Sequence, residues 1–333
     1  MNKSPMKMLF INLLIFSTMI SISANNWLGV WMGLEINLLM FLPLIMSNST
    51  QYLNSSGIKY FIVQSMASII LLIMIMKIMI NENNDNYYSF IILIMSLMMK
   101  MGAAPFHFWF PEMMEQLNWN NCILIMTWQK LAPMLVLSYI LPNKIMMVFI
   151  VLSAMIGAIM GLNQISLRLI LAYSSINHMG WMLAAIQYSI MIWFCYFTIY
   201  SLMTTLIVLL FKYNNVFMLN EVFMMKNPDK LNKLNLMLSM LSLGGLPPLL
   251  GFLPKWMLIQ ELMLKSSYMI TTILIISSVI TLYFYLKLFF SASLISFKEN
   301  KWNNFNLMNL ESLLLYFNIM SSLGLTLSMI TIY

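Results

Sequence analysis

The sequence predicts an all-α, polytopic transmembrane helical bundle of about 11 helices. Of the 333 residues, 61% are hydrophobic and only 8% are charged, whereas about 25% are charged in a typical soluble domain. The mean hydropathy is +0.85. Apolar runs of the length that crosses a bilayer as a helix fill nearly the whole chain. These runs do not alternate polar and apolar residues, as the strands of a membrane barrel would.

The first six predicted spans are long enough for helices with some tilt, and the connections between them are short. The spans are 6–24, 27–46, 58–80, 87–111, 121–141 and 144–163.

Among the remaining five predicted spans, two connections are longer than the others: 213–233 and 294–309. The spans are 167–188, 190–212, 234–263, 268–293 and 310–331. The first of the longer connections holds an apolar patch between polar ends, so we expect an amphipathic segment that lies flat on the membrane. The two cysteines, Cys122 and Cys195, both fall in apolar runs and provide too few ligands for a metal site.

The distribution of basic residues predicts the orientation of the chain. Eleven spans place ten basic residues on the side of the N-terminus and three on the opposite side, and four more fall within spans. The positive-inside rule then places the N-terminus in the cytoplasm or, in a mitochondrion, in the matrix. The C-terminus is expected on the opposite side, which in a mitochondrion is the intermembrane space. The net charge of +7 is scattered between spans, so it does not indicate nucleic-acid binding.

Two predicted spans are interrupted by glycine and proline beside a lysine. In 87–111, Gly102 and Pro105 follow Lys100, and proline is expected to break or kink the helix there. In 234–263 the interruption is denser and precedes Lys255; it contains Gly244, Gly245, Pro247, Pro248, Gly251 and Pro254. A broken helix at membrane depth is tolerated only against protein or a wet cavity. Two such spans indicate a transporter-like protein built from repeats, although glycine and proline also serve helix packing.

Four ionisable side chains lie within the spans and are candidates for a proton path: Glu35, Lys100, Lys130 and Lys255. A charge at membrane depth costs roughly 2.5–3.5 kcal/mol on insertion scales. Burial favours the neutral form of a lysine and a nearby carboxylate favours the charged form. A lysine between these two influences can therefore load and release a proton, and we expect Glu35 near Lys100. The alternative is a static ion pair that orders the bundle.

Three further residues are candidate relay groups. His107 lies close to the interruption after Lys100, and His178 lies in a polar run inside the span 167–188. Histidine titrates near neutral pH, but this polar run can also serve as hydrogen-bonding glue between helices. Lys287 lies within the span 268–293, where it either joins the path or anchors the helix at the interface. There is no phosphate-binding loop, no dinucleotide fingerprint and no cysteine-rich cluster, so we expect no cofactor in this chain.

Several segments resemble the subunit 2 family of mitochondrial NADH dehydrogenase, which is respiratory complex I. They are WMGLEINLLMFLPL (31–44), KMGAAPFHFWFPE (100–112), TWQKLAP (127–133), LAYSSINHMGW (171–181) and GGLPPLLGFLPKW (244–256). The last two are similar to segments of the wider family of antiporter-like subunits. The methionine-rich composition, with 38 methionines, resembles insect or other invertebrate members.

The resemblance implies two inverted five-helix repeats, each with a broken helix. It places an N-terminal helix at 1–24, the first repeat at 25–165, and the second repeat with the C-terminal helix at 166–333. By this resemblance, Glu35 and Lys100 are the Glu/Lys pair of the first repeat. Lys130 is the central lysine that links the two halves of the path, and Lys255 is the corresponding lysine of the second repeat. Eleven helices rather than fourteen would leave an exposed surface that another subunit covers.

The resemblance also implies a function, namely a proton-translocation path in the mitochondrial inner membrane. The path is coupled to electron transfer from NADH to ubiquinone, with no redox centre in this chain. NADH, FMN, iron–sulfur clusters and ubiquinone would be used elsewhere in the complex. Partners would be other membrane-arm subunits, including sister antiporter-like subunits, and lipids. Two alternatives stay open: a stand-alone cation/proton antiporter, and a structural subunit that pumps nothing.

Overall fold

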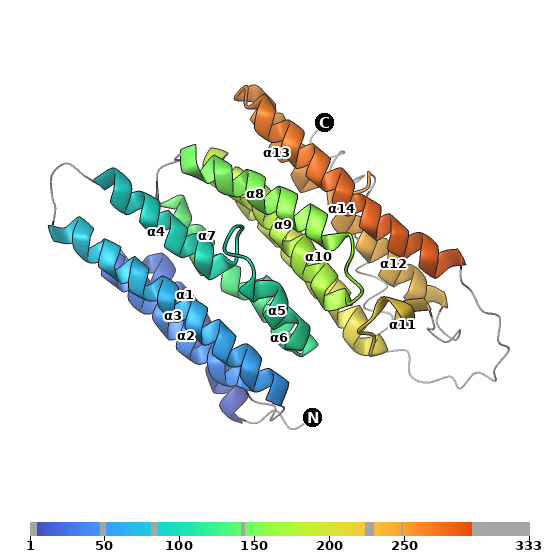
Figure 1. Ribbon diagram of the computed structural model, residues 1–333, viewed down its shortest axis with the longest axis horizontal. Coiled ribbons are helices and arrows are strands. Elements are labelled where there is room, and N and C mark those ends of the chain that lie inside the picture. Colours follow the sequence, from blue (N-terminus) through green and yellow to red (C-terminus); the bar gives the residue numbers. More distant parts are fainter. Residues whose placement is uncertain are drawn as a thin grey trace. The chain divides into compact units, whose positions relative to one another are not determined.

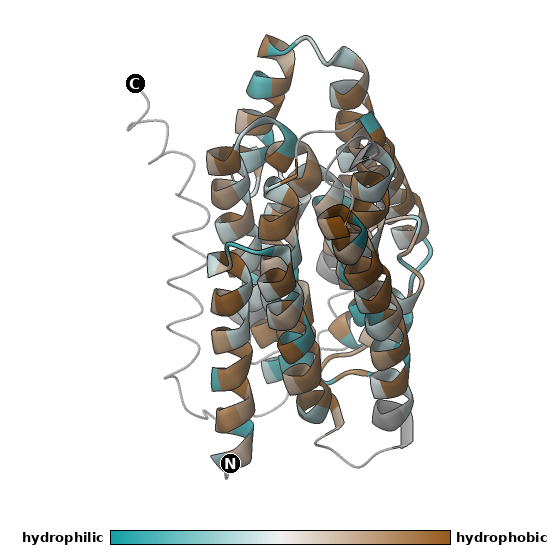
Figure 2. Cartoon of the chain, turned by 90° about the vertical axis from the view of Figure 1, so that its left-hand side faces the viewer, coloured by the Kyte–Doolittle hydropathy of each residue, from teal (hydrophilic) through white to brown (hydrophobic). Residues whose placement is uncertain are grey.

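The computed structural model describes residues 5–46, 51–80, 86–140, 144–223, 230–247 and 249–294. Within these ranges the prediction of an all-helical bundle is confirmed: the regular structure is α-helix, with one isolated bridge between Ser166 and Met218. Eight of the described helices are long and apolar enough to cross a membrane, and apolar residues predominate along them (Figure 2). The last predicted span, 310–331, lies outside the described residues.

The chain divides into two compact units, residues 1–149 and 150–333, which are described separately (Figure 1). The helices up to this division are α1 (Pro5–Ser23), α2 (Trp27–Met46), α3 (Gln51–Ile80), α4 (Asn86–Met101), α5 (Trp109–Gln116), α6 (Trp119–Met126) and α7 (Trp128–Ser138). Helix α8 (Lys144–Gly161) contains the division. It is followed by α9 (Leu167–Tyr188), α10 (Ile190–Asn214), α11 (Leu219–Phe223), α12 (Lys230–Gly244), α13 (Phe252–Leu264) and α14 (Tyr268–Leu294).

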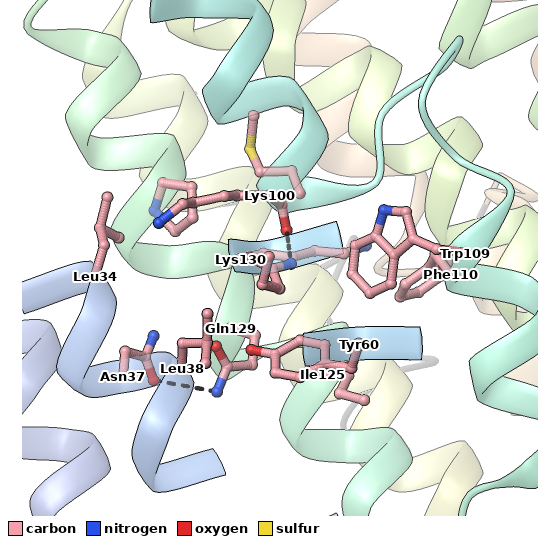
Figure 3. Close-up of a pocket in the computed structure, with 13 residues that line it drawn as sticks. Leu34, Asn37, Leu38, Tyr60, Lys100, Trp109, Phe110, Ile125, Gln129 and Lys130 are labelled. Atoms are coloured by element: carbon pink, nitrogen blue, oxygen red, sulfur yellow. Dashed lines mark hydrogen bonds between the residues drawn. The ribbon is translucent and has the colours of Figure 1, made fainter. Parts of the chain in front are cut away.

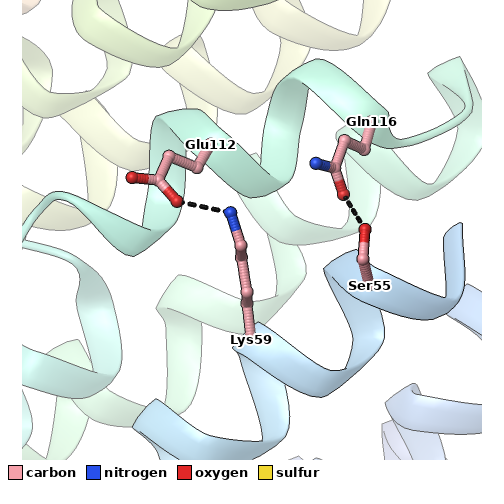
Figure 4. Close-up of polar contacts among 4 residues, drawn as sticks. All are labelled: Ser55, Lys59, Glu112 and Gln116. Carbon is pink, nitrogen blue, oxygen red and sulfur yellow. Dashed lines mark hydrogen bonds and ion pairs between the residues drawn. The ribbon is translucent and has the colours of Figure 1, made fainter. Parts of the chain in front are cut away.

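Polar contacts in the first unit join the helix ends that the predicted topology places on the same side. At the start of α3, Lys59 forms an ion pair with Glu112 of α5, with 2.6 Å between Nζ and Oε2 (Figure 4). One turn away on each helix, the Ser55 hydroxyl donates to Gln116 over 2.8 Å. The Tyr139 hydroxyl, just after α7, donates to the carbonyl of Ile22 in α1 over 3.0 Å. The start of α3 therefore lies beside α5, and the end of α7 beside the end of α1.

The second unit is built around α9, the most buried of the candidate spans. Helices α10, α13 and α14 pack against it, and α8 crosses it at two glycines. A Cβ atom at Gly157 would lie 2.5 Å from the backbone nitrogen of Asn177 in α9. A Cβ atom at Gly180 would lie 2.9 Å from the backbone nitrogen of Ala154 in α8. Small residues at a crossing let two membrane helices approach closely.

One kink was not predicted, in the span 121–141. The structure has α6 and α7 there, separated at Thr127. The Lys130 amide bonds back only three residues, to the Thr127 carbonyl over 3.3 Å. Pro133 lies inside α7, where it has no N–H to donate and its ring crowds the carbonyl four residues earlier, that of Gln129. Lys130 therefore lies in the turn between the break at Thr127 and Pro133.

The connection 213–233 contains the short helix α11, and residues 224–229 of it lie outside the described residues. The Glu221 carboxylate accepts hydrogen bonds from the amides of Phe217 and Met218, at 2.6 and 3.2 Å. The Arg168 guanidinium lies 4.6 Å from the centre of the Phe217 ring. These contacts hold the connection against the start of α9.

Candidate functional site

The first interruption ends α4 at a glycine rather than at the proline. Gly102 adopts a left-handed conformation with φ of +70°, which a residue without Cβ reaches at no steric cost. Its amide bonds to the Met99 carbonyl over 3.2 Å, and the Ala103 amide bonds to the Met98 carbonyl over 3.1 Å. This is the Schellman pattern of a helix C-terminus. Pro105 follows in a cis peptide bond, and helical structure resumes at Trp109.

Lys100 is held in the last turn of α4, with only 6% of its surface exposed. Its Nζ atom is buried and has no hydrogen-bond partner in the structure. Its backbone carbonyl accepts a bond from the Gln64 amide of α3 over 2.9 Å (Figure 3). Gln64 therefore anchors the backbone of α4 and leaves the ammonium group without a direct partner.

Lys100 and Lys130 line the same cavity (Figure 3). The cavity is large enough to hold a water molecule. Helices α2, α3, α4, α5, α6 and α7 all contribute to it, and its other lining residues are Leu34, Asn37, Leu38, Tyr60, Gln64, Met101, Trp109, Phe110, Ile125, Gln129 and Pro133. Two lysines predicted from separate spans thus meet in one partly polar space.

Lys130 follows the kink at Thr127 and is 2% exposed. Its Nζ atom lies 5.3 Å from the centre of the Phe110 ring in α5, a cation–π contact that partly replaces lost hydration. Beside it, the Gln129 amide donates to the Asn37 side-chain oxygen over 3.1 Å. This amide pair joins α7 to α2 and gives the cavity a polar wall.

Glu35 does not form a direct ion pair with Lys100. The structure records no contact within 4.0 Å between the two charged groups. The Glu35 Oε2 atom is buried without a hydrogen-bond partner, and its charge acts on Lys100 and on Tyr60 at longer range. The two groups are therefore close enough to interact electrostatically but form no ion pair, and the Tyr60 side chain is also among the groups near the carboxylate.

His107 lies in the interruption after Lys100 and is 2% exposed. Its Nδ1 atom lies 3.2 Å from the Pro105 carbonyl. Because a carbonyl only accepts, Nδ1 carries the proton in this contact. The opposite atom, Nε2, is buried without a partner. His107 does not line the cavity that holds Lys100 and Lys130.

The second interruption repeats the geometry of the first. Helix α12 ends at Gly244, and Gly245 is left-handed with φ of +82°. The Gly245 amide bonds to the Ser242 carbonyl over 3.1 Å, and the Leu246 amide bonds to the Leu241 carbonyl over 3.4 Å. Pro247 is exposed, Pro254 is buried in the first turn of α13, where proline is tolerated, and Pro248 lies outside the described residues.

Lys255 in α13 contacts the end of α12 across this interruption. Its Nζ atom donates to the Gly244 carbonyl over 2.9 Å and lies 5.8 Å from the centre of the Trp181 ring. The carbonyl end of a helix carries partial negative charge. Lys255 is 4% exposed, and its ammonium group has a hydrogen-bond acceptor in the Gly244 carbonyl. The ammonium group of Lys100 has no hydrogen-bond acceptor in the structure.

Replacing Gly245 with alanine is expected to destabilise the protein by about 1–3 kcal/mol, because a non-glycine residue is strained in this conformation. The new Cβ atom would also lie 3.0 Å from Lys255 Nζ. The matched control is Gly244→Ala, one residue earlier, where the nearest atom to the new Cβ is 3.4 Å away. Thermal unfolding of the two variants in their native assembly measures the difference. Equal melting temperatures would contradict this account.

The remaining candidates take different places in the second unit. His178 is 7% exposed, and its Nδ1 atom lies 2.8 Å from the Tyr196 hydroxyl of α10. Asn177 accepts a bond from the Ser277 hydroxyl of α14 over 3.3 Å. Lys287 is exposed on α14. Within the described residues, no group of three His, Cys, Asp or Glu side chains is placed to hold a metal ion.

The polar residues that surround the lysines were not predicted as part of the site. Asn37, Gln64 and Gln129 are amides inside apolar spans, and such residues are expected to find partners across helices. Their positions in the sequence were therefore a usable signal. The Gly244 carbonyl, by contrast, is a backbone group, and only the geometry of the interruption presents it to Lys255.

Comparison with known proteins gives consistent matches. Residues 24–281 match the family described as NADH:quinone oxidoreductase/Mrp antiporter, TM. The chain is 47% identical to NADH-ubiquinone oxidoreductase chain 2 of Anopheles gambiae, over 95% of each chain. It is 38% identical to the protein of that name from Lemur catta, over 88% of this chain and 87% of the other.

Two solved structures share the fold. The match to a chain of respiratory complex I from Thermus thermophilus has a TM-score of 0.83 at 22% identity, covering 96% of this chain and 78% of that one. The match to a chain of an Mrp complex from Dietzia has a TM-score of 0.74 at 15% identity, covering 85% of this chain and 59% of that one.

Proposed function

Because the chain belongs to the antiporter-like family of NADH:quinone oxidoreductase membrane subunits, we propose that it provides a proton path through its buried lysines. The observation that carries the proposal is the shared cavity of Lys100 and Lys130. Both lysines are buried, and a water molecule in the cavity that they line would link them for proton transfer. Such a pair can exchange a proton when a neighbouring charge changes.

The path would run from Glu35 and Lys100 to Lys130, and then to Lys255. Glu35 acts at longer range, so a small movement of α2 or α4 would change how strongly it holds the proton on Lys100. Lys255 would bind its proton against the carbonyl end of α12. His107, His178 and Lys287 remain candidate relay groups, with His107 presenting an unpartnered Nε2.

We place this path in the mitochondrial inner membrane, with the N-terminus in the matrix and the C-terminus in the intermembrane space. The two repeats would span 25–165 and 166–333. The partners would be the other membrane-arm subunits of the complex. NADH oxidation and ubiquinone reduction would take place elsewhere in the complex, and this chain would hold none of the redox cofactors.

The assembly is tested by gentle solubilisation of native membranes, followed by a native gel and mass spectrometry. We expect this chain in a particle that also contains the other complex I subunits and that oxidises NADH. A small particle that holds this chain alone, and that moves cations and protons in liposomes, would instead favour an independent antiporter.

A further inference from the structure

The two interruptions end a helix with the same backbone geometry, but different side chains bind the carbonyl groups at those ends. The last carbonyls of a helix have no amide of the next turn to bind. At the end of α12, the Gly244 carbonyl accepts a hydrogen bond from Lys255 Nζ over 2.9 Å. At the end of α4, the Lys100 carbonyl accepts one from the Gln64 side-chain amide over 2.9 Å. A charged group therefore binds the second helix end, and a neutral group binds the first.

The contact of Gln64 is buried and has one possible direction. The side chain is 6% exposed and comes from the middle of α3. Because a carbonyl only accepts, the amide nitrogen of Gln64 must face it. The amides of Gly102 and Ala103 bind the two preceding carbonyls of α4, and Gln64 supplies the donor for the next one. The amide therefore continues the series of bonds that closes this helix end.

The same helix end lies beside two lysines, because Gln64, Lys100 and Lys130 line one cavity (Figure 3). The carbonyl end of a helix carries partial negative charge. A hydrogen bond from an ammonium group is stronger than one from a neutral amide, and a bond to the charged form of a group favours that form. An ammonium group on this carbonyl would therefore be held in its charged form.

Of the two lysines, Lys130 is the one that can approach this carbonyl. Side chains of a helix lean toward its N-terminus, whereas its carbonyls point toward the C-terminus, so the Lys100 side chain leads away from its own carbonyl. Lys130 comes from a different helix, α7, and its Nζ atom lies 5.3 Å from the centre of the Phe110 ring. A cation–π contact is weaker than a bond to a helix end and does not fix the ammonium group there.

We propose that Gln64 is a positioning residue that occupies the carbonyl end of α4 and so prevents the Lys130 ammonium group from binding there. This inference rests on the proposed function, because a lysine that is held in its charged form exchanges a proton less readily. Gln64 carries no proton itself. Without its amide, the first interruption would acquire the lysine–carbonyl contact that the second one has.

The structure of the assembled complex with Gln64→Met, determined by electron cryomicroscopy, tests the geometry. Methionine has a similar length and no donor. We expect Lys130 Nζ at about 3 Å from the Lys100 carbonyl oxygen, the length of a hydrogen bond. The matched control is Ser65→Ala, at the next residue of α3, where the hydroxyl bonds to the Ile62 carbonyl of the same helix. Lys130 should not move in the control. A Lys130 side chain that also stays in place in Gln64→Met would overturn the inference.

The consequence for the path is measured with the same variants in liposomes. We expect a normal amount of complex for Gln64→Met and about tenfold slower NADH oxidation coupled to proton movement, a smaller effect than the loss of a proton-transfer group. The number of protons moved per NADH oxidised should fall for Gln64→Met and stay normal for Ser65→Ala. A purely structural role would lower the amount of complex and leave this ratio unchanged, and that result would also overturn the inference.

Failure of this inference and failure of the proposed function are told apart by Lys100→Met, measured in parallel. If Lys100→Met lowers the ratio and Gln64→Met does not, the path stands and Gln64 has no positioning role. If Lys100→Met leaves the ratio unchanged, the proposed function fails, and with it the role of Gln64 in that function, wherever Lys130 lies in the Gln64→Met complex.

Discussion

Replacing Lys100 with methionine is expected to slow NADH oxidation coupled to proton movement by about 10²-fold or more, the usual contribution of a positioned proton-transfer group. The amount of assembled complex should stay the same. Methionine has a similar length and fills the same apolar surroundings, and Lys100 Nζ makes no hydrogen bond that would be lost. Replacing a buried charge with an apolar residue is often neutral or stabilising.

The matched control for this change is Lys77→Met, at the exposed end of α3. Coupled rates are measured for both variants together with the abundance of the complex on a native gel. A normal coupled rate in the Lys100→Met complex would remove this residue from the path. It would also favour the alternative of a purely structural subunit.

Replacing Gly157 with valine is expected to prevent assembly of the complex. The new Cβ atom would lie 2.5 Å from the Asn177 nitrogen and 2.8 Å from the Tyr173 carbonyl oxygen. Both are backbone atoms of α9, so relief requires α8 and α9 to move apart. Overpacking that shifts the backbone costs about 1–3 kcal/mol and occasionally more, and α9 is the most buried of the described candidate spans.

The control for this change is Ile159→Val, two residues later on α8, where the side chain is 51% exposed. The measurement is the abundance and melting temperature of the assembled complex. We expect a normal complex for Ile159→Val and little or none for Gly157→Val. Similar abundance and stability of the two would show that the close crossing of α8 and α9 is dispensable.

Much of the fold could be predicted because the bilayer restricts what an apolar run of about 20 residues can form. The interruptions beside Lys100 and Lys255 were predicted from glycine and proline, although glycines in left-handed conformations end α4 and α12. The kink at Thr127 was not predicted because no glycine or proline stands at that position, and Pro133 lies six residues further along an otherwise apolar run.

The site was less predictable because it depends on contacts between distant segments. The sequence could identify Lys100 and Lys130 as charges within spans, but it could not show that both line one cavity. It suggested that Glu35 lies near Lys100, and the carboxylate does act on this lysine, but it could not show that the two groups form no ion pair within 4.0 Å. Such distances depend on how α2, α4 and α7 pack, which no local pattern determines.

The most direct test of the proton path is the number of protons translocated per NADH oxidised, measured in liposomes with purified complexes carrying Lys100→Met or Lys77→Met. We expect a lower ratio for Lys100→Met, measured at the slowed rate of NADH oxidation that this variant retains, and an unchanged ratio for Lys77→Met. The same ratio in both complexes and in the unmodified one would contradict the claim that the buried lysines carry protons.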